Sequence, residues 1–299
     1  MPTDRVVLVS GSTGKQGGAI ARALLDRGWS VRAMTRKPQD EPARQLRELG
    51  AEVVAADLDD EASLRSALDN AWGALSLQNS WEGGVAHEEE AGKRFARVAK
   101  EMGIQHLVYQ SVASAHRRTG IPHFESKWRI EETVRSLEFP SYVIIRPVMF
   151  MENLLVPDTL TGIQNGVYAL AVRPDTKLQS IAVRDIGAYG LLAFESATEL
   201  NGRAIDIAGD ELTGPEMAGI LSDVTGHRVQ FRQMPIEQVR AFSEDIAKNF
   251  EWFDNVGYDV DIEKTSAEYG ITPTRFRTWA AQQNWSAGSR AAEYAGASH

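Results

Sequence analysis

The sequence predicts an α/β protein: one doubly wound parallel sheet with a smaller α+β lobe on its C-terminal side. Apolar strand-like runs alternate with helix-like segments, and these runs lack the polar alternation of a half-exposed sheet. A glycine-rich turn joins the first strand to the first helix. The alternation weakens beyond about residue 150. We therefore expect a first domain over 1–150, a lobe forming a cleft with it over 151–285, and a frayed tail over 286–299.

Six strands are expected in the first half, over residues 6–9, 31–35, 51–60, 73–78, 106–112 and 141–147. The first helix follows the glycine turn, and Gly28 closes it. Later helices are expected over 41–49, 61–68, 88–102 and 127–136. Past Pro147 we expect short strands, a helix starting near Asp185, a helix and then a strand over 213–235, and aromatic-rich helices over 236–258.

The composition excludes several classes of site and partner. The chain has 299 residues with 43% apolar and 24% charged residues, as in ordinary soluble proteins. It has no cysteine, so disulfides and thiolate zinc sites cannot form, and its six histidines show no metal-ligand spacing. A net charge of −9 argues against direct nucleic-acid binding. Neither a signal peptide nor a membrane span is apparent, so we expect a cytoplasmic protein.

The glycine turn has the spacing of a phosphate-binding loop. Its sequence is Gly11-Ser12-Thr13-Gly14-Lys15-Gln16-Gly17. It follows an apolar strand and opens a helix, where backbone N–H groups can hold a pyrophosphate and glycine lets the ligand approach closely. In this context the turn predicts a dinucleotide site.

The end of the second strand indicates which dinucleotide is bound. NAD-binding proteins usually place an acid there for the ribose hydroxyl, whereas this chain has Thr35-Arg36-Lys37. The Arg36 guanidinium can bind a 2′-phosphate, which favours NADP; the alternative is a solvated loop. Asp57 and Leu58, after the third strand, are expected at the adenine edge, unless this acidic segment only caps the next helix.

With these residues in place, the chain resembles the NmrA-like branch of the atypical short-chain dehydrogenase superfamily. The resemblance extends from residue 6 to about residue 285, and its motifs are GSTGKQGG, TRKP, GAEVVAADLDD, HFESKWRIEE, IIRPVMFMENLL and IAVRDIG. It implies a Rossmann-type NADP-binding domain with a small C-terminal lobe. It also implies that the cofactor is held by Gly11 through Gln16, Arg36, Asn79, Lys127, Phe150 and Asn153. In HEEEAGKR (87–94) acids replace a lysine of some relatives, so no contact is carried over there.

The segment HFESKW departs from the superfamily at its proton-donating residue. A tyrosine normally stands four residues before the lysine, which holds the nicotinamide ribose and lowers the tyrosine pKa; here His123 precedes Lys127. Because histidine titrates near 6.5, it is a poorer proton source beside an ammonium group. Ser111 occupies the position of the serine that orients the substrate carbonyl. The alternatives are a capping or packing role for His123, a solvated Lys127, and a Ser111 that bonds its own turn.

Two functions remain open from the sequence. The family includes NADP(H)-responsive regulators that act through protein partners, and NADPH-dependent reductases of quinones and other carbonyl compounds. A sugar-nucleotide epimerase is disfavoured because the tyrosine is missing. Trp81 and Phe150 are pocket candidates for a flat substrate, and the aromatic residues over 250–258 form either a pocket wall or the core of the lobe.

Overall fold

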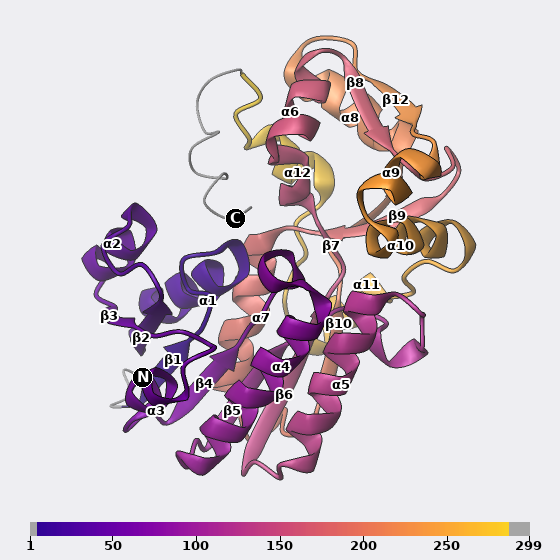
Figure 1. Ribbon diagram of the computed structural model, residues 1–299. Helices are drawn as coiled ribbons and strands as arrows, with labels where there is room; N and C mark the ends of the chain where they lie inside the picture. Colours follow the sequence, from indigo (N-terminus) through magenta and orange to yellow (C-terminus); the bar gives the residue numbers. More distant parts are fainter. Residues whose placement is uncertain (1–4, 287–299) are drawn as a thin grey trace. The chain divides into compact units, whose positions relative to one another are not determined.

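The computed structural model describes residues 5–286 (Figure 1). Its Cα packing divides the chain into two compact units, each built from several stretches. The first unit comprises residues up to 115, 124–146 and 186–206; the second comprises 116–123, 147–185 and the residues from 207 onward. The domain limits expected from the sequence stay a prediction, and all of the expected tail except Ser286 lies outside the described residues.

A seven-stranded parallel sheet forms the centre of the first unit, in the order β10-β6-β5-β4-β1-β2-β3. The six expected strands are confirmed, with small shifts at their ends; the third is shorter than expected. They are β1 (Val6–Val9), β2 (Ser30–Thr35), β3 (Glu52–Ala55), β4 (Gly73–Ser76), β5 (His106–Gln110) and β6 (Ser141–Pro147). The seventh, β10 (Ala204–Ile207), was missed because it is short and lies where the alternation had weakened.

The helices of the first unit are α1 (Lys15–Asp26), α2 (Glu41–Glu48), α3 (Glu61–Leu68), α4 (Ser80–Glu101), α5 (Pro122–Ser136) and α7 (Val183–Glu195). The expected starts of α4 and α5 were wrong. The first turn of α4 forms because the Asn79 side chain accepts hydrogen bonds from the backbone N–H groups of Trp81 and Glu82. Gly84, with φ 83°, interrupts the helix and hid this turn from a periodicity argument. Helix α5 begins at a proline, which is favourable in a first turn.

The second unit is built from short strands and helices, as expected. Its sheets have the orders β11-β9-β7 and β12-β8. Its strands are β7 (Met149–Phe150), β8 (Val167–Leu170), β9 (Lys177–Ile181), β11 (Asp210–Thr213) and β12 (Gln230–Gln233). Its helices are η1 (Ala115–Arg117), η2 (Met151–Leu155), α6 (Pro157–Gln164), α8 (Gly214–Thr225), α9 (Ile236–Phe242), α10 (Glu244–Asn255), α11 (Ile262–Tyr269) and α12 (Phe276–Ala281). Among residues 5–286, no helix combines the length and apolar composition that crossing a membrane requires.

Each unit has its own apolar core. In the first, Leu8, Leu107 and Ile144 on the strands pack with Phe95 and Ile130 on α4 and α5. In the second, a separate cluster centres on Tyr168, Leu221 and Phe276. The first core fixes the strands whose carboxyl ends carry the predicted cofactor site.

The buried imidazole of His106 makes the stability of the first unit sensitive to acid. Its ring stacks on Trp72 and hydrogen-bonds to Ser141 and the Ala193 carbonyl. Burial lowers the pKa of His106 to about 4, from an ordinary value of 6.5. Because an unfolded chain binds this proton more readily, stability is fully present above pH 6.5 and falls as the pH drops toward 4, by roughly 3 kcal/mol in all.

We expect His106→Phe, which keeps a ring but cannot titrate, to have a flatter stability profile between pH 6.5 and 4. Urea unfolding of both proteins across this range measures the difference. Parallel profiles would show that His106 is not the group responsible.

Candidate functional site

The fold of the glycine loop leaves little room for a side chain at two of its positions, Gly11 and Gly17. Gly11 has φ +60°, in the left-handed region, and a Cβ atom there would lie 2.8 Å from Cδ2 of Leu77. A Cβ atom on Gly17 would lie 2.3 Å from the carbonyl oxygen of Gly11. Gly14 precedes α1 as its N-cap and offers no side chain to the first N–H groups. The loop therefore has the close-packed form that backbone binding of a phosphate needs.

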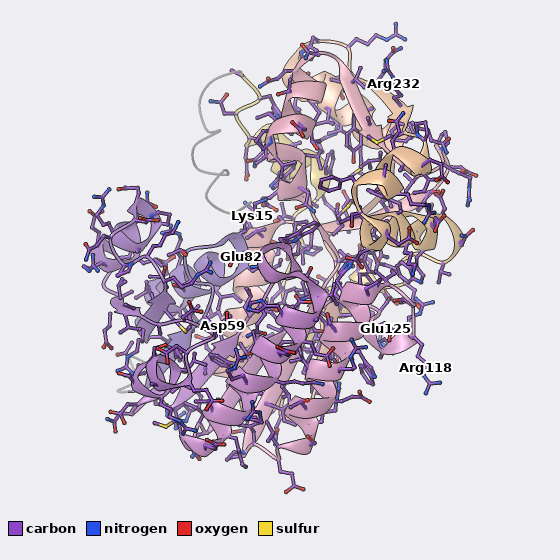
Figure 2. The ribbon with its side chains drawn as sticks, viewed as in Figure 1. Lys15, Asp59, Glu82, Arg118, Glu125 and Arg232 are labelled. Atoms are coloured by element: carbon purple, nitrogen blue, oxygen red, sulfur yellow. The ribbon has the colours of Figure 1, made fainter. Side chains whose placement is uncertain are left out.

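The loop is tied to both neighbouring strands at their carboxyl ends. The Ser12 hydroxyl donates to the Met34 carbonyl of β2 at 2.9 Å. The Ser10 hydroxyl donates to the Leu75 carbonyl of β4 at 2.9 Å and accepts from the Leu77 N–H at 2.8 Å. The first turn of α1 contains no acid, and Oε1 of Gln16 is buried without a hydrogen-bond partner among the described residues. The acid-free start of α1 fits a bound pyrophosphate, whereas the Gln16 oxygen, which only accepts, calls for a donor; Lys15, in the same loop, is labelled in Figure 2.

Arg36 follows β2 and is the basic residue predicted to contact a 2′-phosphate. Its Nη2 atom lies 2.5 Å from Oε2 of Glu82, in the first turn of α4, and its side chain is 54% exposed. The Arg36 guanidinium therefore points toward α4. A 2′-phosphate would have to compete with Glu82 for it, but an ion pair this exposed is weak.

The acidic segment after β3 is occupied by local contacts. The Asp57 carboxylate accepts from the Asp59 N–H, and the Leu58 carbonyl accepts from Arg94. Asp60 is the N-cap of α3, accepting from the Ala62 N–H, so the capping alternative considered for this segment does occur. Adenine contacts of Asp57 and Leu58 stay a prediction.

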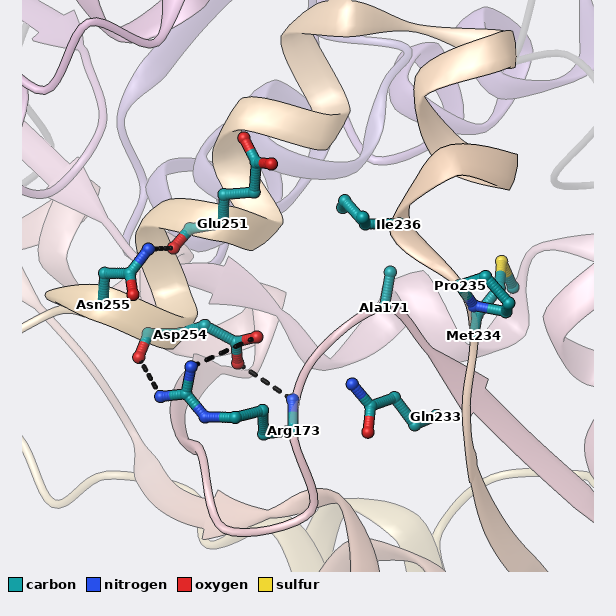
Figure 3. Close-up of a pocket in the computed structure, with 9 residues that line it drawn as sticks. All are labelled: Ala171, Arg173, Gln233, Met234, Pro235, Ile236, Glu251, Asp254 and Asn255. Atoms are coloured by element: carbon teal, nitrogen blue, oxygen red, sulfur yellow. Dashed lines mark hydrogen bonds and ion pairs between the residues drawn. The ribbon is translucent and has the colours of Figure 1, made fainter.

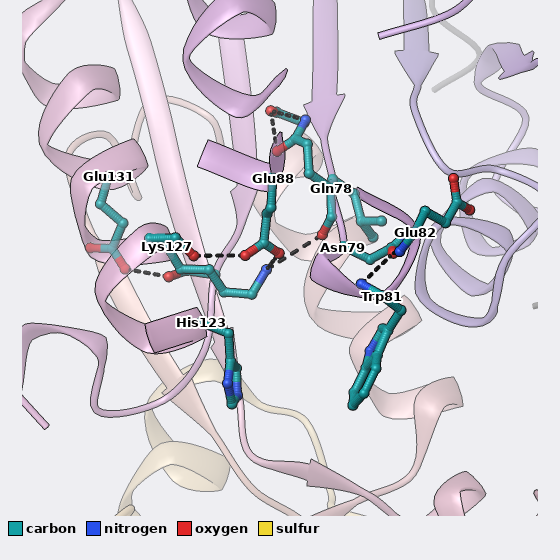
Figure 4. Close-up of polar contacts among 12 residues, drawn as sticks. Gln78, Asn79, Trp81, Glu82, Glu88, His123, Lys127 and Glu131 are labelled. Atoms are coloured by element: carbon teal, nitrogen blue, oxygen red, sulfur yellow. Dashed lines mark hydrogen bonds and ion pairs between the residues drawn. The ribbon is translucent and has the colours of Figure 1, made fainter. Parts of the chain in front are cut away.

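Lys127 lies on α5 and is held by a buried acid of α4. Its Nζ atom is 2.7 Å from Oε1 of Glu88 and 3.4 Å from the Gln78 carbonyl, just past β4 (Figure 4). The Glu88 side chain is 0% exposed, and its second oxygen accepts from the Ser126 hydroxyl at 2.7 Å. Lys127, at 14% exposed, is therefore not a solvated helix lysine. The sequence showed Glu88 among the acids of 87–94, but gave it no contact.

Ser111 is also engaged by a buried acid. Its hydroxyl donates to Oε1 of Glu131 at 2.6 Å, and the same carboxylate accepts from Arg146 at 2.8 Å and 2.6 Å. Ser111 therefore bonds a side chain of α5 rather than its own turn. Tyr109 nearby is fully buried, and burial together with the charges of Glu88 and Glu131 raises its pKa well above its ordinary value. It belongs to the core and cannot replace the missing tyrosine as an acid.

His123 stands in the first turn of α5, four residues before Lys127 in the sequence. Its Nδ1 atom lies 2.7 Å from Oδ2 of Asp245, and its backbone N–H donates to the other oxygen at 3.1 Å. Burial tends to raise the pKa of Asp245, but the hydrogen bonds from His123 outweigh it and hold the pKa below its ordinary value. Asp245, at the start of α10, was not found from the sequence.

The remaining predicted residues have separate structural roles. Asn79 caps α4, and Trp81 beside it is 69% exposed. In the second unit, Phe150 ends β7, and Asn153 is an exposed residue of η2. Cofactor contacts of Asn79, Phe150 and Asn153 stay predictions.

The aromatic residues over 250–258 pack on one another. Trp252 and Phe253 are buried, and each has its ring centroid 5.3 Å from that of Tyr258, which supports the lobe-core interpretation. A pocket of about 340 Å³ lies where β8 and β12 end near α10 (Figure 3); Glu251, Asp254 and Asn255 of α10 line it, but none of these aromatic residues does. An ion pair between Arg173 and Asp254 forms part of its wall. None of the predicted site residues lines it.

Comparison with known proteins identifies the family. The model of the NmrA-like family matches residues 3–280. The chain belongs to the NmrA-like family. An NmrA-like family domain-containing oxidoreductase of Aspergillus hancockii is 29% identical over 91% of this chain and 84% of its own.

Several solved structures share the fold. NmrA, a negative transcriptional regulator in complex with NADP, is 20% identical with a TM-score of 0.77, over 94% of this chain and 95% of its own. NmrA is also found in complex with NAD. The quinone oxidoreductase QOR2 of Escherichia coli, complexed with NADPH, is 20% identical with a TM-score of 0.78, over 92% and 98%. The chain thus has an NAD(P)-binding fold.

We expect Lys127→Met to destabilise the protein by about 3–5 kcal/mol, because it leaves the buried Glu88 carboxylate without its counter-charge. Urea unfolding measures this loss, and adding Glu88→Gln should recover most of it. Lys93→Met is the matched control, because Lys93 forms an ion pair with Glu89 at 36% exposure and should cost less than about 1 kcal/mol. If Lys127→Met and Lys93→Met lower the free energy of unfolding by equally small amounts, Lys127 does not form a buried ion pair.

Proposed function

We propose that this NmrA-like protein binds NADP(H) and acts as a redox-state sensor through a protein partner in the cytoplasm. The glycine loop and the uncapped start of α1 support dinucleotide binding. Arg36 at the end of β2, with no acid in its place, supports NADP over NAD. The family includes a transcriptional regulator that binds NADP, which supports a regulatory role.

The observation that carries the sensor proposal is the state of the three candidate catalytic side chains. Lys127, Ser111 and His123 each make a short contact with a carboxylate, at 2.7, 2.6 and 2.7 Å, and the first two contacts are the ones that oppose catalysis. The tyrosine that would donate a proton is absent. A serine whose proton points to Glu131 and a lysine neutralised by Glu88 are poorly placed for the superfamily's carbonyl chemistry.

A second candidate is an NADPH-dependent reductase of a quinone or other small carbonyl compound. The His123–Asp245 pair favours it, because a carboxylate bound to one imidazole nitrogen orients the ring for proton donation from the other. The bound cofactor would supply hydride. Lys127 would then act electrostatically, and His123 or water would supply the proton. The oxidoreductase relatives of this family support it as well.

NADPH oxidation separates the two candidates. We expect the purified protein to oxidise NADPH no faster with quinones, enals and aldehydes than without them, measured by absorbance of the reduced nicotinamide. Turnover with an acceptor would contradict the sensor. Its loss in the double variant Glu88→Gln/Lys127→Ala, shown by urea unfolding to be folded, while Glu88→Gln and Lys93→Ala keep it, would establish the reductase. If such turnover survives in His123→Phe, water rather than His123 supplies the proton.

We expect Arg36→Ala to weaken NADP binding by roughly 10- to 100-fold while changing NAD binding little, because a charge-assisted contact to the 2′-phosphate is lost. Calorimetric titration with both dinucleotides measures the two effects. Arg44→Ala is the matched control: Arg44 is 57% exposed and, like Arg36, lies 2.5 Å from a glutamate. Equal losses for NADP and NAD in Arg36→Ala would overturn the assignment.

A further inference from the structure

The Lys127–Glu88 pair, on α5 and α4, lies beside the segment that follows β4, which relates it to the nicotinamide half of the cofactor. Strand order reverses between β1 and β4, and dinucleotides bind across such a reversal. The glycine loop at the reversal would hold the pyrophosphate, and Arg36 on the β2 side would hold the phosphorylated adenosine. The nicotinamide half then falls on the β4 side, where the Gln78 carbonyl is 3.4 Å from Nζ of Lys127.

Close packing of α4 against α5 fixes this pair. A Cβ atom on Gly92, one turn after Glu88, would lie 2.5 Å from Cδ1 of Ile130 and 3.1 Å from Oε1 of Gln78. The absence of a side chain at Gly92 lets the two helices approach. Glu88 then has both oxygens engaged, by Lys127 and Ser126, without access to solvent. Its charge is therefore held beside the ammonium group rather than screened by water.

The Lys127–Glu88 pair lies where it can affect how the site binds the oxidised and the reduced nicotinamide ring, which differ in charge. The oxidised nicotinamide ring carries a positive charge, which the reduced ring lacks. An unpaired Lys127 would repel the oxidised ring, whereas the pair with Glu88 has no net charge. We propose that Glu88 determines the redox preference of the site, by cancelling the charge of Lys127 so that NADP⁺ is held without repulsion. This inference rests on the proposed NADP(H) binding.

The test compares the dissociation constants of NADP⁺ and NADPH for wild type and Glu88→Gln. We expect the variant to shift the ratio toward NADPH on the order of tenfold, the scale of one unit charge acting at short range inside a protein. Binding of 2′,5′-ADP, which lacks the nicotinamide, should change less than about twofold. Glu89→Gln is the matched control: it removes the same charge one residue away, where Glu89 pairs with Lys93 and Arg129, and should leave the ratio unchanged.

The outcomes are distinct. An unchanged ratio in Glu88→Gln, or a shift toward NADP⁺, would overturn the role of Glu88. A wild-type protein that binds neither 2′,5′-ADP nor either dinucleotide would instead refute the proposed function, and the inference with it. If Glu88→Gln does not fold, the double variant Glu88→Gln/Lys127→Met, with both charges removed, should keep the wild-type ratio. A tenfold change in that variant would also overturn the proposal.

Discussion

The reversal of strand order between β1 and β4 is the constraint on which the site depends. Strands β2 and β3 extend the sheet on one side of β1, and β4, β5 and β6 extend it on the other. The chain connections after β1 and β4 therefore run to opposite sides of the sheet, as at the strand-order reversals where ligands bind in such sheets. The glycine loop occupies this place because Gly11 packs against Leu77 and Ser10 bonds the end of β4. A side chain at Gly17 would clash with the loop's own backbone, and one at Gly11 would be strained by its positive φ.

Buried charge is the second organising feature. Glu88 and Glu131 have no solvent exposure, and a lone carboxylate in such a place would be strongly destabilising. Glu88 is satisfied by Lys127 and Ser126, and Glu131 by Arg146, Arg135 and Ser111. Ser111 and Lys127, to which the resemblance assigns the carbonyl-orienting and ribose-holding roles, therefore each lie beside a buried carboxylate. Under the proposed function, this setting separates a protein that binds NADP(H) without the usual proton chemistry from a reductase of the same fold.

The features that could be predicted from the sequence are those that depend on neighbouring residues in the chain. The apolar runs gave six strands, and the glycine spacing gave the loop, because both depend on residues close together in the chain. Sequence reasoning missed the first turn of α4, since a cap at Asn79 and a break at Gly84 are not periodic signals. It also missed the partners of the site residues. Glu88 is 39 residues from Lys127, and Asp245 is 122 residues from His123, so only tertiary packing brings them together.

The central claim is that NADP(H) binds at the carboxyl ends of β1 and β4. Hydrogen exchange of the wild-type protein, with and without saturating NADP⁺, tests it most directly. We predict slower exchange for the amides of residues 11–18 in the loop and first turn of α1, and for residues 77–82 after β4. We predict no protection around Gln233 and Asp254 in the pocket of the second unit. Protection confined to that pocket, with the glycine loop unchanged, would contradict the account.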